Sequence, residues 1–256
     1  MEVLRIEHLS KDFGGVHAVS DITFSVEGGE RLAIIGPNGA GKTTLFNLIN
    51  GQLHPTAGRI YFSGRDITNV FTHRLAHAGQ SRSFQLISLF LNLTVLENAL
   101  LALHGTKPSR FQVLRPITSY ADLLAKAEET LKTAALWEQR DELVKNLSYG
   151  EQRRLEIALT TVPSGLKLLL LDEPSCGLTG AEGADITNMI RKLGRDITVL
   201  LVAHDMDLVF GVAERIMVLH YGQVIADGEP KEIRADPRVR EIYMGAEEGT
   251  ENAGAS

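Results

Sequence analysis

A glycine-rich segment that follows an apolar run constrains this chain more than any other part of its sequence. Residues 36–43 read Gly-Pro-Asn-Gly-Ala-Gly-Lys-Thr, and residues 32–35 before them are apolar, as in a buried strand. The spacing G-x-x-x-x-G-K-[ST] predicts a loop whose backbone N–H groups surround the phosphates of a nucleoside triphosphate at the start of a helix. Lys42 would then reach the β- and γ-phosphates, and the Thr43 hydroxyl would help to hold Mg²⁺.

The same pattern predicts contacts to the nucleotide from the whole of this loop and from the first turn of the helix. The alternative is a glycine-rich turn without a ligand, which the complete spacing disfavours. The expected contacts are Gly36, Pro37, Asn38, Gly39, Ala40, Gly41, Lys42, Thr43 and Thr44.

Two adjacent carboxylates end a second apolar run. Residues 168–171 are four consecutive leucines, which indicates a strand buried on both faces, and Asp172 and Glu173 follow. Successive strand residues point to opposite sides, so the two carboxylates have different roles. Asp172 can hold Mg²⁺ through water beside Thr43, and Glu173 can polarise the water that attacks the γ-phosphorus. Alone, this pair would indicate a solvated turn, but together with the glycine-rich loop it predicts nucleotide hydrolysis.

A third motif lies at a predicted helix start. Residues 147–152, Leu-Ser-Tyr-Gly-Glu-Gln, precede a helical pattern over 153–162. Ser148 and Glu151 form a predicted capping box, which many helices carry for stability alone. The cap does not require Gly150, where glycine costs about 1 kcal/mol relative to alanine. Because a bare backbone there lets a phosphate approach the helix N-terminus, Ser148 and Gly150 are also candidate nucleotide contacts.

Residues 147–152 resemble the signature sequence of ATP-binding-cassette (ABC) ATPases, usually Leu-Ser-Gly-Gly-Gln, and the motifs follow one another in that family's order. The resemblance implies that Phe13 stacks on adenine, that Gln85 contacts the metal and links the nucleotide to a membrane partner, and that His204 contacts the γ-phosphate. Taken singly, a Phe is usually core, a Gln is usually solvated, and His204 could cap the next helix. The catalytic residues that the resemblance implies are Glu173, His204, Gln85 and Lys42, and the metal-contacting residues are Thr43, Gln85 and Asp172.

Within this family, the chain resembles the ATP-binding subunits of branched-chain amino acid importers. The segments that carry this resemblance are 82–85, 89–90, 93–98, 149–158, 173–178, 236–239 and 243–245. One departure is Thr179, where the family often has Asp. The resemblance implies a P-loop NTPase fold, with ATP and Mg²⁺ as ligands. It also implies a dimer of identical or paralogous cassettes, with each ATP between the glycine-rich loop of one subunit and Ser148 and Gly150 of the other.

The implied partners are integral membrane permeases and, indirectly, a solute-binding protein, and the implied location is the cytoplasmic face of the inner membrane. We expect the chain to power import of branched-chain or related amino acids. The alternatives are the ATPase of a sister importer for urea, amides or other amino acids, and a soluble ABC ATPase outside transport.

Composition and charge agree with these expectations. The chain has 256 residues and a net charge of −6, which argues against binding to nucleic acid or to an anionic lipid surface. No apolar run reaches the roughly 18 to 20 residues that span a bilayer, so any membrane attachment would run through a protein partner. We expect one nucleotide-binding domain over 1–245, with a helical lobe at about 86–165, and a disordered tail over 246–256.

The predicted fold class is α/β, with a mostly parallel central sheet, an antiparallel β flank and an inserted helical lobe. The expected strands are 2–9 and 19–27 in the flank and 31–36, 168–172 and 197–203 in the central sheet. Between Gln85 and a helix expected from Thr94, Leu89 and Phe90 are large apolar residues in a loop. They either pack beneath the helical lobe or, as the resemblance implies, line a groove for a short helix of the permease.

Overall fold

Two sheets of different kinds form the body of the molecule. The structure is a computed structural model and describes residues 1–83, 88–105 and 121–242. The first sheet has the strand order β10-β9-β3-β8-β7-β6, in which only the β10–β9 pair is antiparallel. Its strands are β3 (Arg31–Ile35), β6 (Gln80–Arg82), β7 (Leu168–Asp172), β8 (Thr198–Val202), β9 (Arg215–His220) and β10 (Gln223–Gly228).

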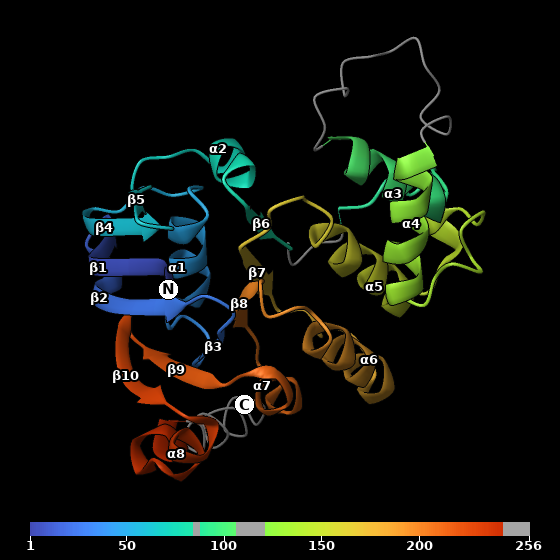
Figure 1. The fold of residues 1–256 in the computed structure, drawn as a ribbon. Coiled ribbons are helices and arrows are strands. Elements are labelled where there is room, and N and C mark those ends of the chain that lie inside the picture. Colours follow the sequence, from blue (N-terminus) through green and yellow to red (C-terminus); the bar gives the residue numbers. More distant parts are fainter. Residues whose placement is uncertain (84–87, 106–120, 243–256) are drawn as a thin grey trace.

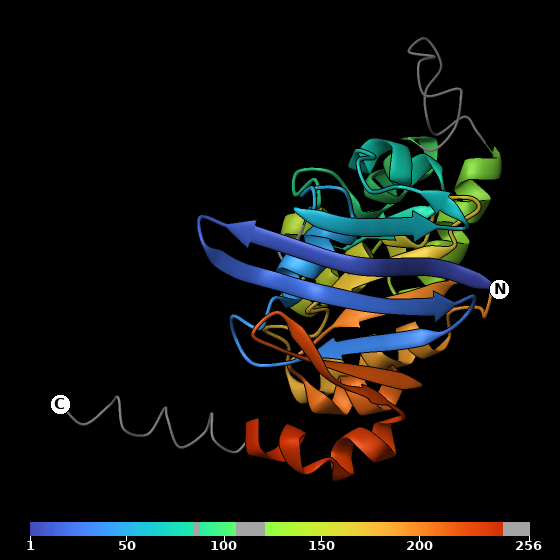
Figure 2. The ribbon, with the colours of Figure 1, turned by 90° about the vertical axis from the view of Figure 1, so that its left-hand side faces the viewer.

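The second sheet is antiparallel throughout, with the order β2-β1-β4-β5. Its two long strands, β1 and β2, cross the near face of the molecule in Figure 2. They are longer than the apolar alternation predicted, because the added ends are half-buried or exposed and are held by the backbone ladder rather than by core side chains. The strands are β1 (Glu2–Phe13), β2 (Val16–Glu27), β4 (Ala57–Phe62) and β5 (Arg65–Asp66).

Helices cover both faces of the six-stranded sheet. α1 lies on the side that carries the antiparallel sheet, whereas α3, α4 and α5 gather at the opposite end of the molecule (Figure 1). The helices are α1 (Lys42–Ile49), α2 (Thr72–His77), α3 (Val95–Gly105), α4 (Ala121–Thr133), the short 3₁₀ helix η3 (Val144–Asn146), α5 (Tyr149–Thr160), α6 (Gly180–Arg191), α7 (Met206–Val212) and α8 (Pro230–Ala235).

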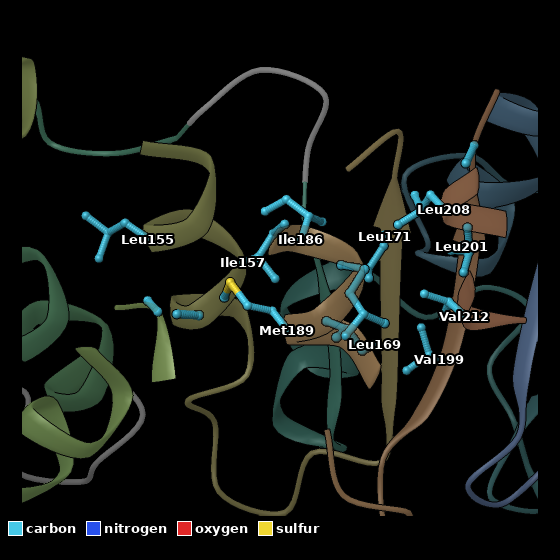
Figure 3. Close-up of a cluster of buried hydrophobic side chains, with 14 of the residues drawn as sticks. Leu155, Ile157, Leu169, Leu171, Ile186, Met189, Val199, Leu201, Leu208 and Val212 are labelled. Carbon is cyan, nitrogen blue, oxygen red and sulfur yellow. The ribbon is translucent and has the colours of Figure 1, made fainter. Parts of the chain in front are cut away.

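The run of leucines in β7 divides its side chains between two cores. All five residues of β7 are buried, and alternate residues point to opposite faces. Leu168 and Leu170 pack into a core with α1 and the antiparallel sheet. Leu169 and Leu171 pack into the other core, against side chains of α6 and α7 (Figure 3). Continuous apolar sequence is therefore required here, because neither face of the strand meets water.

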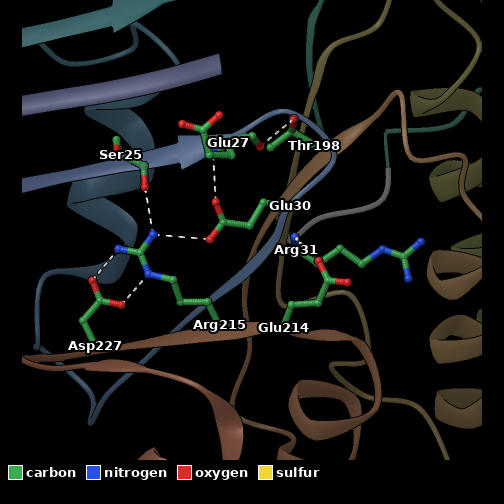
Figure 4. Close-up of polar contacts among 8 residues, drawn as sticks. All are labelled: Ser25, Glu27, Glu30, Arg31, Thr198, Glu214, Arg215 and Asp227. Carbon is green, nitrogen blue, oxygen red and sulfur yellow. Dashed lines mark hydrogen bonds and ion pairs between the residues drawn. The ribbon is translucent and has the colours of Figure 1, made fainter. Parts of the chain in front are cut away.

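A charged cluster ties the two sheets together (Figure 4). Arg215 of β9 makes a bidentate ion pair with Asp227 of β10, with both N–O distances 2.6 Å. The same guanidinium donates to the backbone carbonyl of Ser25 in β2 at 2.9 Å and to the Glu30 carboxylate at 3.3 Å. The hydrogen bonds to Asp227 above all, and then the Glu30 carboxylate, raise the pKa of the Arg215 guanidinium. A planar group with several donors can hold strands from both sheets in one arrangement.

The predicted fold class is confirmed, with a mostly parallel sheet and an antiparallel flank. The helix expected from Thr94 is present as α3, and a cap precedes it: the Thr94 N–H donates to the Glu97 carboxylate at 2.7 Å, and the Glu97 N–H to the Thr94 hydroxyl at 3.1 Å. The boundaries of the helical lobe, 86–165, stay a prediction, and the expected tail over 246–256 lies outside the described residues. Within the described residues, no helix is both long and apolar enough to cross a membrane.

Candidate functional site

The glycine-rich loop joins the carboxyl end of β3 to α1, and its backbone conformation requires glycine. Gly36, Gly39 and Gly41 have φ angles of 152°, 79° and 102°. A Cβ atom at Gly36 would collide with the carbonyl oxygen of Leu219, and one at Gly41 with that of Ala18. The loop is therefore wedged between β9 and β2, with its backbone close to both.

Lys42 lies at the start of α1 and is 6% exposed. Its ammonium donates to the carbonyl oxygens of Gly36 at 2.6 Å and Pro37 at 2.9 Å, so it spans the inside of the loop. Burial lowers the pKa of the Lys42 ammonium, and the carboxylates of Glu173 and Asp172 oppose part of that shift. The loop and the two carboxylates predicted from separate motifs thus belong to one electrostatic site.

The N-terminus of α1 is free to bind an anion. No side chain among the described residues caps this helix, and its first turn has no acidic residue. Backbone N–H groups at a helix start need acceptors, which phosphate oxygens can supply. Thr43 is exposed and Thr44 is half-buried at this end. Both positions suit contact with a phosphate or with a cation that accompanies it.

The two carboxylates at the end of β7 have different partners. Asp172, whose side chain is 8% exposed, forms an ion pair with Arg82 of β6 at 2.8 Å. Glu173 bonds through Oε1 to Nε2 of His204 at 2.8 Å. Glu173 also has a φ angle of +46°, a conformation that a residue with a side chain adopts only when its surroundings hold it there.

His204 lies between β8 and α7, and its side chain is 46% exposed. The alternative that it caps α7 is wrong, because Asp205 is the N-cap and accepts from the N–H groups of Asp207 at 2.9 Å and Leu208 at 3.2 Å. His204 is left facing Glu173. The structure therefore brings the loop, Asp172, Glu173 and His204 to one edge of the sheet, where open α/β sheets bind ligands.

Ser148 caps α5 as predicted. The Ser148 N–H donates to the Glu151 carboxylate at 2.8 Å, and the Glu151 N–H to the Ser148 hydroxyl at 3.3 Å. The structure gives a second reason for Gly150: a Cβ atom there would collide with the carboxylate of Glu182 in α6. Glu182 cannot simply move aside, because its carboxylate accepts from the N–H of Thr179 at 3.0 Å and from its hydroxyl at 2.8 Å. These bonds also hold the pKa of the Glu182 carboxyl below its usual value.

Ser148 and Gly150 do not join the site at the sheet edge. They line a separate hollow of about 150 Å³ together with residues of α5 and α6, and no residue of the glycine-rich loop reaches it. Its lining is Ser148, Gly150, Glu151, Arg154, Glu182 and Asp185.

Phe13 and Gln85 have different outcomes. Phe13 ends β1, where it pairs with Val16, and is 46% exposed, so it is not a core residue. The ammonium of Lys11 lies 5.1 Å from the centre of its ring. An exposed ring can stack on a flat ligand. Gln85 lies outside the described residues.

Sequence reasoning missed two arginines that hold the end of β7. Arg82 binds the Asp172 carboxylate, and its side chain also donates to Asn47 at 2.7 Å and Gln52 at 3.0 Å. Arg153 of α5 is buried and donates to backbone carbonyls at the end of β7. The only available signal was the spacing of Arg153 and Glu156, which equally describes an exposed pair on a helix surface.

Comparisons with known proteins agree with this geometry. A family model described as "ABC transporter" matches residues 19–176, and one described as "Branched-chain amino acid ATP-binding cassette transporter" matches residues 223–249. The high-affinity branched-chain amino acid transport ATP-binding protein BraF of Pseudomonas aeruginosa is 37% identical over 254 residues, covering 95% of this chain and 98% of that protein. LivG of Escherichia coli K12, with the same description, is 37% identical and covers 95% and 98%.

Solved structures agree as well. The ADP conformation of an ATP-binding cassette of an ABC transporter matches with a TM-score of 0.82 at 36% identity, covering 96% of this chain and 99% of that one. A dimeric cassette in a post-hydrolysis state with ADP and Pi matches with a TM-score of 0.72 at 28% identity, covering 88% and 98%. The resemblance drawn from the sequence is confirmed: this chain belongs to the ABC transporter family, as an ATP-binding cassette that hydrolyses ATP.

Proposed function

We propose that this chain powers import of branched-chain or related amino acids through partner membrane permeases. Similarity to branched-chain amino acid transport ATP-binding proteins over nearly the whole chain supports the substrate class. The observation that supports the transport role is an apolar groove of about 350 Å³ between β6, α3 and α5. None of its lining residues belongs to the glycine-rich loop. Its lining is Ser81, Arg82, Ser88, Leu89, Phe90, Asn98, Leu101, Ala102, Glu156, Leu159 and Thr160.

Phe90 lines this groove, and its backbone is fixed by a neighbouring side chain. The buried amide of Asn98 accepts from the Phe90 N–H at 2.9 Å and donates to the Phe90 carbonyl at 3.1 Å. The backbone is thus fixed in both directions, and Phe90 is 62% exposed. An aromatic side chain fixed in the open beside an apolar groove suits a partner helix, for which it can contribute about 2 kcal/mol or more. The exposure of Phe90 disagrees with the alternative that it packs beneath the helical lobe, whereas Leu89 is half-buried and packs against the hydrophobic core, as that alternative expected.

At the nucleotide, each side chain has a proposed role. Lys42 binds the β- and γ-phosphates, Glu173 orients and polarises the attacking water, and His204 contacts the γ-phosphate from its place beside Glu173. Gln85 is proposed to link this site to the permease. Phe13 stacks on the adenine.

Among the described residues, Thr43 and Asp172 would hold Mg²⁺, and Gln85, outside the described residues, is the third proposed contact. The donor set fits: a hydroxyl and a carboxylate are hard oxygen ligands, and Mg²⁺ is usually bound by one or two carboxylates together with substrate phosphates. No cluster of three or more acidic, His or Cys side chains that could hold a metal by itself occurs in the described ranges. When bound, the cation neutralises charge that develops on the phosphates.

We infer that two cassettes, identical or paralogous, share each ATP. In this inference Ser148 and Gly150 contact the nucleotide of the partner subunit, and their position in a hollow apart from the glycine-rich loop supports it. The permeases would hold the chain at the cytoplasmic face of the inner membrane, with a solute-binding protein as an indirect partner. The alternative is the ATPase of a sister importer for urea, amides or other amino acids, and a transport assay with each solute distinguishes them.

The experiment replaces Phe90 by Asp and measures membrane recovery and amino acid uptake in cells that co-express the permeases. Phe71→Asp is the matched control, because Phe71 is 58% exposed but lies at the start of α2, outside the groove. We expect Phe90→Asp to abolish membrane association and uptake while ATP binding by the isolated chain is retained. Equal membrane recovery of the two variants would contradict docking at this groove.

A further inference from the structure

Arg153 is the largest fully buried side chain in the described structure, and its place is unusual for a charge. Its side chain is 1% exposed, and it lies in the second turn of α5, five residues after the Ser148 cap. A buried charge is tolerated only when hydrogen bonds and an opposite charge compensate it. Here the hydrogen bonds come mainly from the end of another element, β7, and the opposite charge comes from Glu156 of the same helix.

The guanidinium binds three consecutive carbonyl oxygens where β7 ends. Nε donates to Pro174 at 3.0 Å, and Nη2 donates to Asp172 at 3.1 Å and to Glu173 at 3.0 Å. The remaining nitrogen, Nη1, donates to the buried carboxylate of Glu156 at 2.6 Å. Only a planar cation with several fixed donors can bind all of these acceptors at once, so lysine is not an equivalent.

The backbone that Arg153 binds is also strained. Glu173 has a φ angle of +46°, which aims its side chain at His204, and its N–H donates to the carbonyl oxygen of Val202 at 2.8 Å. A residue with a side chain stays in this conformation only when neighbouring groups fix it from several sides. The bond to Val202 fixes the N–H side, and Arg153 fixes the carbonyl side.

We propose that Arg153 is a positioning residue that holds Glu173 in the conformation needed for catalysis. It thereby connects α5, which begins within the signature-like residues 147–152, to the end of β7 in the same subunit. Glu156 orients the guanidinium and neutralises its charge. This rests on the proposed role of Glu173 as the residue that orients the attacking water. Arg153 itself does not contact the nucleotide; it acts through the backbone of residues 172–174.

The test must separate positioning from simple support of the fold. The double variant Arg153→Met/Glu156→Leu removes both charges of the buried pair, a change that proteins often tolerate without loss of stability. Arg153→Lys keeps the charge but not the planar set of donors. Glu156→Gln keeps the guanidinium and an acceptor for it. Each variant is assayed as the full chain for melting temperature, ATP affinity, kcat and ATP-dependent dimer formation.

We expect the double variant and Arg153→Lys to bind ATP with wild-type affinity and to lose about 10²-fold in kcat, the usual cost of a small misplacement of a catalytic group. Both should accumulate as ATP-bound dimers, because binding continues while hydrolysis is slow. Glu156→Gln keeps an acceptor but leaves the buried guanidinium without its counter-charge, so we expect a lower melting temperature and a smaller fall in kcat than in the arginine variants. Wild-type kcat in both arginine variants, or a fall in ATP affinity as large as the fall in kcat, would overturn the proposal.

Two further outcomes are decisive. If both arginine variants fail to fold, Arg153 is a structural residue and the proposal is wrong. Glu173→Gln, assayed in parallel, tests the assumption that Glu173 orients the attacking water. Hydrolysis at the wild-type rate in that variant would contradict this role of Glu173 and, with it, the positioning role of Arg153. An inactive Glu173→Gln beside a fully active Arg153→Lys and double variant would overturn the positioning role alone.

Discussion

The glycine-rich loop and the end of β7 lie at the same edge of one sheet but are held in place by different means. The loop is shaped by its own glycines, which let the backbone approach Leu219 and Ala18. The end of β7 is held by charged side chains from other elements: Arg82 of β6 binds the Asp172 carboxylate, and Arg153 of α5 binds the backbone. One half of the site is therefore local in sequence, and the other half depends on tertiary structure.

This difference predicts different failures. A change in the loop alters backbone geometry and should weaken nucleotide binding while leaving the rest of the fold intact. A change beneath β7 leaves a buried charge without its partner and should reduce the stability of the whole domain. Three sets of variants test this contrast, in order of expected size.

The largest effect is expected for Arg82→Met. It removes one partner of an ion pair in which both side chains are less than a tenth exposed, so we expect the free energy of unfolding to fall by about 3–5 kcal/mol. Arg154→Met is the matched control, because the Arg154–Asp185 pair is 21% and 53% exposed and should contribute only about 0–1 kcal/mol. Urea denaturation measures both. If Arg82→Met lost as little stability as Arg154→Met, the claim that a buried ion pair holds the end of β7 would be contradicted.

An intermediate effect is expected for Gly41→Ala in the loop. A side chain at φ 102° costs about 1–3 kcal/mol in backbone strain, and the Ala18 carbonyl must also move. If the loop relieves this strain by leaving its binding conformation, ATP affinity falls by about 5- to 150-fold. Gly39→Ala is the control, since a Cβ atom there meets no neighbour and only strain remains. Titration calorimetry should show the smaller loss for Gly39→Ala, and equal losses would contradict the wedge between β2 and β9.

The smallest stability effect is expected for Ser148→Ala, which removes the cap of α5 and should cost about 1 kcal/mol. Thr94→Ala removes the equivalent cap of α3, away from the proposed nucleotide contacts. We expect similar falls in melting temperature for the two, but a loss of ATPase activity only for Ser148→Ala. Ser148→Arg should spare ATP binding by the monomer and block dimer closure. Full ATPase activity of folded Ser148→Ala would show that Ser148 serves only as the N-cap of α5 and does not contact the nucleotide.

The contrast between the loop and the end of β7 also explains which parts of the site could be predicted from the sequence. The loop and the pair Asp172–Glu173 could be predicted, because their chemistry depends on the spacing of adjacent residues and on a strand of four leucines. The cap at Ser148 was predictable for the same reason. The fold class followed from the continuous apolar strands, although β6, with the sequence Gln-Ser-Arg, has no apolar pattern and is a strand only because it pairs with β7.

The rest depends on residues that are distant in the sequence. Arg82 and Asp172 are 90 positions apart, and neither segment contains a local pattern that predicts their ion pair. Glu182 explains the need for glycine at position 150 through a contact between two helices, which no local pattern contains. Buried charges are the hardest to predict, because a solvated arginine and a buried one look alike until their acceptors are known.

The central claim is that the loop binds the nucleotide while the end of β7 hydrolyses it, and Glu173→Gln tests this most directly. The change removes the charge that orients water but leaves Lys42, the loop and Asp172 in place, so binding and hydrolysis should separate. We predict normal ATP affinity, a loss of turnover of about 10²- to 10⁴-fold, and a stable ATP-bound dimer by light scattering. Only monomer in the presence of ATP, together with near-normal release of phosphate, would contradict the account.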